Sequence, residues 1–237
     1  MAKRKKGERP GFVAVEGPPA VGKAALVGHL AARSRVRTVK LDPRENPFLS
    51  AALSIEAVAG ASASPDEATA GRAFSAQMFC LLARHAQQDG LRQGELFERR
   101  ALSVGTFARD RVFAEATLSS EELALYDRIH AVLAPRAVRP DLTVLLMDRP
   151  EILHARLRAR LRPWERQVSV PWMERLVQGF GRMAERWQSG PLLRIELGGV
   201  ELGEDEDALE SVAQEVVKAA AELGSADRRI VRMGARP

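Results

Sequence analysis

Residues 12–24 combine a short apolar run, a glycine-rich turn and a lysine in the spacing of a phosphate-binding loop, Gly-x4-Gly-Lys. Gly17 and Gly22 let the backbone wind tightly, so that its N–H groups can point at phosphate oxygens. Lys23 supplies a cation for the outer phosphates, and a helix that begins there adds the positive end of its dipole. The residues expected to contact phosphate are Gly17, Pro18, Pro19, Ala20, Val21, Gly22, Lys23 and Ala24. The alternative is a glycine turn with a structural role alone.

Three further polar side chains occupy positions where a ligand could bind. Asp42 closes a strand expected over 36–42, and ligands of open parallel sheets bind at the carboxyl ends of the strands. Gln77 and Arg84 lie on the apolar stripe of a long helix expected from Pro65 to about Gln88. Polar side chains that face inward need partners, and these are either a ligand or another buried residue.

The order of apolar segments predicts the fold class. Strands are expected near residues 12–16, 36–42, 95–103, 141–148 and 192–197, with helical patterns between them. Strands that alternate with helices form a parallel sheet covered by helices. With the phosphate loop after the first strand, we expect an α/β, single-domain P-loop NTPase fold with a five-stranded parallel sheet flanked by helices. The domain is expected to span 11–223, between a disordered basic tail (1–10) and a loose C-terminal tail (224–237).

Composition narrows the class of protein further. The chain has 237 residues, a formal net charge of +5 and a single cysteine, Cys80. One cysteine excludes disulfides within the chain and fits a reducing, cytoplasmic setting. No apolar run is long enough to span a membrane. The positive charge allows anionic ligands, but an aromatic content of only 5% makes a nucleic-acid partner unlikely.

Several motifs, taken in order, resemble those of the deoxynucleoside kinase family. These are Asn46-Pro-Phe-Leu49, Ala73-Phe-Ser-Ala-Gln77 continuing to Arg84, Ala108-Arg-Asp-Arg-Val-Phe-Ala114, Pro140-Asp-Leu142, and Arg160-Leu-Arg162-x-x-Glu165. The resemblance covers roughly residues 12–183, and the ordered series is more specific than any single motif. It implies transfer of the γ-phosphoryl of ATP, or of another nucleoside triphosphate, to the 5′-hydroxyl of a (deoxy)nucleoside, with Mg²⁺.

The resemblance also implies roles for individual residues. Lys23 would hold the donor phosphates, and Asp42 would be the base that takes the proton of the 5′-hydroxyl. Gln77 would bind the nucleobase edge and Arg84 would line the same pocket. Arg160 and Arg162 would belong to an arginine-rich lid over the triphosphate, and Glu165 would face the 3′-hydroxyl of the sugar. For the lid arginines the alternative is a solvated basic helix face.

Departures from the family pattern leave two hypotheses about function. Ala24 stands where Ser or Thr would bind Mg²⁺, and Val104-Gly105 replace an acid–tyrosine pair. Glu98 and Arg99 resemble a Glu-Arg pair that other members carry after the third strand, so Glu98 is the expected magnesium ligand and both residues are expected to be catalytic. The chain is therefore either a nucleoside kinase, which could act as a homodimer, or a catalytically degenerate relative that serves as a nucleotide-binding scaffold or sensor.

Overall fold

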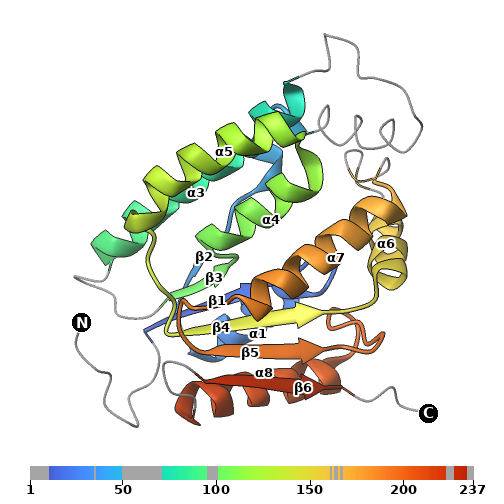
Figure 1. Ribbon diagram of the computed structural model, residues 1–237. Coiled ribbons are helices and arrows are strands. Elements are labelled where there is room, and N and C mark those ends of the chain that lie inside the picture. The colour runs from blue at the N-terminus through green and yellow to red at the C-terminus, as the bar shows by residue number, and fades with distance from the viewer. Residues whose placement is uncertain are drawn as a thin grey trace.

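The computed structural model describes residues 11–34, 36–49, 71–94, 101–160, 162, 165, 168–222 and 227–233. Its centre is one sheet of six parallel strands in the order β2-β3-β1-β4-β5-β6 (Figure 1). The strands are β1 (Phe12–Glu16), β2 (Arg37–Val39), β3 (Ala101–Val104), β4 (Leu142–Met147), β5 (Leu192–Glu196) and β6 (Arg228–Arg232). Because all strands are parallel, their carboxyl ends meet at one edge, where the loop after β1 begins.

Helices cover this sheet. They are α1 (Lys23–Ser34), α3 (Arg72–Gly94), α4 (Phe107–Thr117), α5 (Ser120–Leu133), α6 (Pro150–Ala159), α7 (Val170–Glu185) and α8 (Glu206–Glu222), with short 3-10 turns at Pro43–Glu45 and Ala134–Arg136. Helix α1 packs beside α8, whereas α4 contacts α7, α3 and α5 (Figure 1). Among the described residues, no helix is both long and apolar enough to cross a membrane.

The core lies between β4 and the helices on either side of it. Every residue of β4 is buried, as expected for a nearly continuous apolar strand with both faces covered. The long side of α7 that contains Met173, Leu176 and Phe180 has no exposed surface and belongs to the same cluster. The α/β, P-loop architecture expected from the sequence is therefore confirmed.

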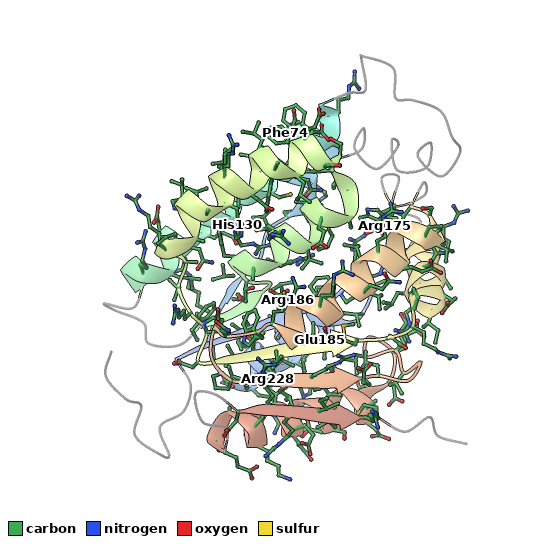
Figure 2. The ribbon with its side chains drawn as sticks, in the orientation of Figure 1. Phe74, His130, Arg175, Glu185, Arg186 and Arg228 are labelled. Carbon is green, nitrogen blue, oxygen red and sulfur yellow. The ribbon has the colours of Figure 1, made fainter. Side chains whose placement is uncertain are left out.

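The sheet has six strands, and the prediction of five was wrong. The sixth strand, β6, lies within the segment 224–237 that was expected to be a loose tail. Its sequence, Arg-Arg-Ile-Val-Arg, contains only two apolar residues, so no apolar run marked it as a strand. Its place is fixed by pairing with β5 and by Arg228, whose guanidinium donates hydrogen bonds to the carbonyls of Glu185 (2.9 Å) and Trp187 at the end of α7 (Figure 2).

Two expected boundaries on the other side of the sheet also moved. Strand β2 contains only residues 37–39, so Asp42 lies beyond its end and caps a 3-10 turn. The long helix, predicted from Pro65 to Gln88, is described from Arg72 to Gly94, because it continues through Gly90 without a break. The part of that prediction that falls on residues 65–70 lies outside the described residues.

Candidate active site

The phosphate loop has the tightly wound backbone that its glycines permit. Gly17 and Gly22 have φ angles of +137° and +95°, in the region that side chains other than glycine rarely adopt. A Cβ atom on Gly17 would lie 2.3 Å from the carbonyl oxygen of Leu146, so only glycine fits between β1 and β4. Ala20, at the tip, also has a positive φ of +63°. This strained backbone indicates a preorganised anion site.

Lys23, the first residue of α1, is held inside this loop. Its Nζ donates hydrogen bonds to the carbonyl oxygens of Gly17 (2.8 Å) and Pro18 (2.5 Å), and only 8% of the side chain is exposed. Burial lowers its pKa well below the ordinary value, and the nearby guanidinium of Arg109 lowers the pKa further. Phosphate oxygens would supply the negative charge that this desolvated ammonium lacks.

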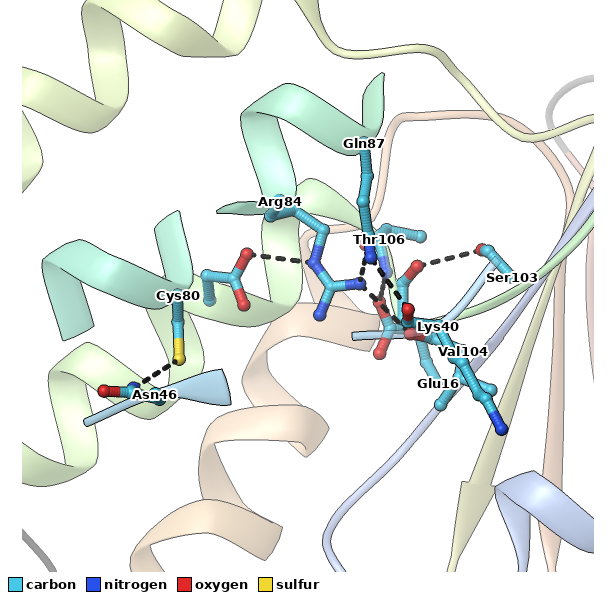
Figure 3. Close-up of polar contacts among 11 residues, drawn as sticks. Glu16, Lys40, Asn46, Cys80, Arg84, Gln87, Ser103, Val104 and Thr106 are labelled. Carbon is cyan, nitrogen blue, oxygen red and sulfur yellow. Dashed lines mark hydrogen bonds and ion pairs between the residues drawn. The ribbon is translucent and has the colours of Figure 1, made fainter. Parts of the chain in front are cut away.

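Glu16, which the sequence analysis did not single out, is a buried carboxylate next to the loop. It ends β1 and has no exposed surface. Its Oε1 accepts a hydrogen bond from the backbone N–H of Thr106 (2.5 Å), while Oε2 has no hydrogen-bond partner among the described residues (Figure 3). Burial raises the pKa of Glu16 above its ordinary value. A charged residue within an otherwise apolar strand was the signal that could have identified it.

Arg84 and Asp110 form a buried ion pair beneath the acceptor side of the site. The Nε of Arg84 lies 3.2 Å from Oδ2 of Asp110, and the two side chains are 4% and 6% exposed. Arg84 also donates to the side chain of Gln87 (3.3 Å) and to the carbonyl oxygen of Val104 (3.1 Å) (Figure 3). Arg84 was expected to line the substrate pocket directly. Its Nε and Nη1 donate to protein atoms, which positions Asp110, and its role in the substrate pocket stays a prediction.

Gln77 is buried on the same helix, α3, and its amide is available. The residue is 9% exposed, and the amide makes no hydrogen bond to any residue that the structure describes. Next to Gln77 on α3, the carbonyl oxygen of Ala76 accepts a hydrogen bond from the side chain of Asn46 (3.0 Å). The same side chain also donates to Sγ of Cys80 (3.3 Å), so Asn46 fastens the turn after β2 to α3. A buried amide without a partner fits a ligand-binding role, since structural amides are satisfied.

Asp42 lies in the turn that Asn46 anchors. Its carboxylate accepts two hydrogen bonds from Nε of Arg44 (3.0 Å each) and one from the Arg44 backbone N–H (3.0 Å). The side chain is 31% exposed, and its hydrogen bonds with Arg44 lower its pKa to about 2. The structure thus places Asp42 in an ion pair.

The expected lid residues follow α6. Arg160 is exposed at the end of this helix, and its charge contributes to the lowered pKa of Lys23, so it faces the loop. Nη1 of Arg162 lies 3.5 Å from Oε1 of Glu165. Glu165 is buried, its Oε2 has no partner among the described residues, and burial raises its pKa.

The remaining residues expected from the sequence are Glu98, Arg99 and Ala24. Glu98 and Arg99 lie outside the described residues, so the structure does not place them. Ala24 is exposed in the first turn of α1. Arg156, in α6, is buried and pairs with Asp148 (3.1 Å). Its role is to join the end of β4 to the turn after β5, since it also donates to the carbonyl oxygen of Gly199 (2.7 Å).

The fold and the site define a P-loop architecture with a cluster of buried polar side chains next to the phosphate loop. The family model for deoxynucleoside kinases matches residues 13–221, which is most of the chain. The chain belongs to the deoxynucleoside kinase family.

Individual relatives agree with this assignment. The chain is similar to the deoxyguanosine kinase of Bacillus subtilis (strain 168), with 23% identity over 171 residues, covering 71% of this chain and 76% of the relative. Its fold is similar to structures of deoxyadenosine kinase from M. mycoides. The structure of that enzyme with dCMP and dCDP bound matches with a TM-score of 0.67 and 15% identity, covering 87% of this chain and 99% of the other. Its structure with bound dATP also gives a TM-score of 0.67, at 16% identity, covering 86% and 98%.

These comparisons confirm the resemblance expected from the sequence. They favour a nucleoside kinase over the alternative of a catalytically degenerate scaffold. Nucleotide binding follows from membership of the family. The roles of individual residues remain to be argued from the site.

Proposed function

We propose that this protein transfers the γ-phosphoryl group of ATP, or of another nucleoside triphosphate, to the 5′-hydroxyl of a deoxynucleoside. The observation that carries this proposal is the wound phosphate loop that holds Lys23 at the carboxyl edge of the sheet. Helix α3, which contains the buried amide of Gln77, is fastened to the same edge by the hydrogen bond from Arg84 to the carbonyl oxygen of Val104 (3.1 Å). A phosphate site adjacent to a hydrogen-bonding pocket suits a reaction that joins a triphosphate to a small polar acceptor.

The donor side of the reaction would use the loop and the lid. Lys23 exchanges the two loop carbonyls for the β- and γ-phosphate oxygens, and the loop N–H groups surround the remaining oxygens. Arg160, whose charge already reaches Lys23, closes over the triphosphate together with Arg162. Binding the lid to an anion would draw Arg162 away from Glu165, which frees that carboxylate for the 3′-hydroxyl of the sugar.

The acceptor side would use the residues fastened to α3. Gln77 presents a donor and an acceptor to the edge of the nucleobase. Asp42 is the proposed general base for the 5′-hydroxyl. A carboxylate whose pKa is about 2 is a weak base, so we infer that the bound acceptor displaces Arg44 and restores the basicity of Asp42.

Magnesium, which this family of reactions requires, fits the residues near the loop. Among the described residues no three His, Cys, Asp or Glu side chains form a metal cluster. Mg²⁺ keeps several waters and needs only one or two carboxylates besides the phosphates. The unpartnered Oε2 of Glu16 is such a carboxylate oxygen, and Glu98 is a second candidate from the sequence. When bound, the ion would neutralise charge on the β- and γ-phosphates.

A homodimer and a cytoplasmic location complete the proposal. Helices α3 and α5, which contact each other, expose the apolar side chains of Leu82, Leu125 and Val132. Such residues suit an interface between two copies of the chain. Light scattering after size exclusion would measure the mass, and a monomer at micromolar concentration would exclude the dimer.

A phosphoryl-transfer assay tests the function. The protein is incubated with ATP and each of the four deoxynucleosides, with and without Mg²⁺, and the deoxynucleoside monophosphate is quantified. We expect Mg²⁺-dependent transfer to at least one acceptor and a loss of about 10²–10⁴-fold in Asp42→Asn. Asp89→Asn is the matched control, because Asp89 is also paired with an arginine on the surface, Arg92. Nucleotide binding without transfer to any acceptor would instead establish the degenerate scaffold.

A further inference from the structure

Arg109, in the first turn of α4, forms no direct ion pair with the described residues, although Glu16 and Asp110 lie close enough to raise its pKa. It makes no hydrogen bond with the described residues either, and its one recorded contact places Cζ 4.8 Å from the centre of the Phe113 ring. Burial lowers its pKa below the ordinary value for arginine. By contrast, the neighbouring Arg111 is 42% exposed and pairs with Asp127 and Glu115. An arginine whose guanidinium contacts an aromatic ring and donates no hydrogen bond to the described residues is available to an anion.

The backbone around Gly105 brings this guanidinium to the phosphate loop. The N–H of Gly105 donates to the carbonyl oxygen of Val15 (2.9 Å), and the next residue, Thr106, bonds to Glu16, so this turn lies against the end of β1. A Cβ atom on Gly105 would lie 2.9 Å from Cδ and 3.1 Å from Nη1 of Arg109. The guanidinium therefore fills the space that a side chain at residue 105 would occupy, beside the strand that leads directly into the loop.

Arg109 influences the pKa values of ionisable groups on both the donor side and the acceptor side of the site. On the donor side it lowers the pKa of Lys23 and opposes the raised pKa of Glu16. On the acceptor side it lowers the pKa of Asp110. Arg84 lies nearby, but its Nε and Nη1 donate to Asp110, Gln87 and the carbonyl oxygen of Val104. The guanidinium of Arg109 makes no hydrogen bond to a described residue, so all of its donors are available to a ligand at the junction of the donor and acceptor sites.

We propose that Arg109 donates hydrogen bonds to the oxygens of the phosphoryl group while it is transferred, and that residue 105 is glycine to leave room for it. This inference rests on the proposed kinase function. In the reaction, the acceptor 5′-oxygen forms a bond to the γ-phosphorus and the bond from that phosphorus to the β–γ bridging oxygen breaks, while the 5′-hydroxyl proton passes to Asp42. Arg109 gives up no proton and stabilises the negative charge on the oxygens in transit.

Substitution of Arg109 separates this role from a structural one. In Arg109→Gln we expect kcat to fall about 10²–10³-fold, with the ATP dissociation constant and the acceptor KM changed less than about threefold. Arg109→Lys should recover part of kcat, because it keeps the charge but not the fork of donors. The matched control, Arg111→Gln, should keep wild-type turnover. A lower Tm of unliganded Arg109→Gln together with an unchanged kcat would show that Arg109 is structural.

Displacing Arg109 without removing it gives a second test. Gly105→Ala places a methyl group where the guanidinium stem lies, at a φ of +92°. Gly71→Ala is the matched control, since Gly71 has a φ of +80° and open space around its Cβ position. We expect Gly105→Ala to lower kcat at least tenfold more than Gly71→Ala. Equal effects of the two substitutions would overturn the steric part of the inference.

Binding of a transition-state mimic makes the test independent of turnover. Calorimetry with ADP, aluminium fluoride, Mg²⁺ and the deoxynucleoside should show at least 10²-fold weaker binding to Arg109→Gln than to wild type, while ADP alone binds equally to both. Equal binding of the mimic would refute the role of Arg109. A wild-type protein that binds the mimic through Arg109 but transfers no phosphoryl group would contradict the proposed function and reduce the role of Arg109 to anion binding, whereas transfer that does not depend on Arg109 would overturn this inference alone.

Discussion

Replacing Arg84 by methionine tests how much the buried ion pair between Arg84 and Asp110 contributes to the stability of the fold. Methionine keeps most of the volume of the arginine stem but removes the cation that lies 3.2 Å from Asp110. Removing one partner of a buried ion pair costs about 3–5 kcal/mol, because the other charge stays desolvated and unpaired. Arg109 remains close enough to lower the pKa of Asp110, so we expect the lower end, about 3 kcal/mol at pH 7.

The loss of stability in Arg84→Met should depend on pH, and its direction follows from the pKa of Asp110. Burial raises the pKa of Asp110 in the folded protein, and Arg84 is the largest influence that lowers it. Without Arg84 the folded-state pKa moves further above the unfolded value of about 3.9. A carboxyl group with a raised folded-state pKa favours folding while it is protonated and opposes folding as the pH rises through that pKa. The destabilisation of Arg84→Met should therefore be largest at pH 7 and smaller at pH 5.

Urea denaturation followed by circular dichroism measures these free energies. The set comprises wild type, Arg84→Met, Asp110→Asn and the double variant, at pH 7 and pH 5, and we expect a coupling energy of about 2 kcal/mol or more at pH 7. Arg111→Met is the matched control, because it removes an exposed pair with Asp127 and should cost no more than about 1 kcal/mol. A loss below about 1 kcal/mol in Arg84→Met, or a loss that is the same at both pH values, would refute the argument.

Three further predictions address the ligands. Lys23→Ala should weaken ATP binding by at least about 100-fold. The unfolding free energy should stay equal or rise, because Lys23 is desolvated in its loop. Titration of a fluorescent ATP analogue measures the affinity, and an unchanged affinity would exclude a phosphate loop. Gln77→Ala should raise the acceptor KM by about 5–30-fold or change the preferred nucleobase, since one or two hydrogen bonds are lost; identical kinetics with all four deoxynucleosides would place the base elsewhere. Ala24→Thr should lower the Mg²⁺ concentration that gives half-maximal turnover, because the exposed first turn of α1 has room for a hydroxyl ligand. An unchanged half-maximal Mg²⁺ concentration would show that the ion is held away from this turn.

Local sequence signals predicted most of the fold. The strands β1, β4 and β5 are apolar runs, and α7 and α8 have regular apolar faces, so their existence followed from composition and period alone. The edge strands were harder to predict. Strand β2 was expected over 36–42 but has only three residues, whereas β6, with three arginines, was not expected because its pairing with β5 leaves no local pattern.

The candidate site was predicted on its donor side and only partly on its acceptor side. The loop around Lys23 is a contiguous motif, so its conformation followed from the residues themselves. Glu16 and Arg109 come from distant parts of the chain and acquire their roles through the turn at Gly105, which brings α4 against the end of β1. Such a meeting of segments is a tertiary contact, and residue spacing carries no information about it.

The strand β6 also protects the protein from edge-to-edge association with other copies of itself. Strand β5 is rich in leucine and isoleucine, and without β6 its backbone N–H and C=O groups would form an open, apolar edge that could accept a strand from another molecule. By covering that edge with Arg228, Arg229 and Arg232, the protein presents a charged rim that repels an identical rim on another copy. Removing residues 227–237 should therefore show itself first as aggregation during expression and refolding, before any effect on the phosphate loop at the far side of β4.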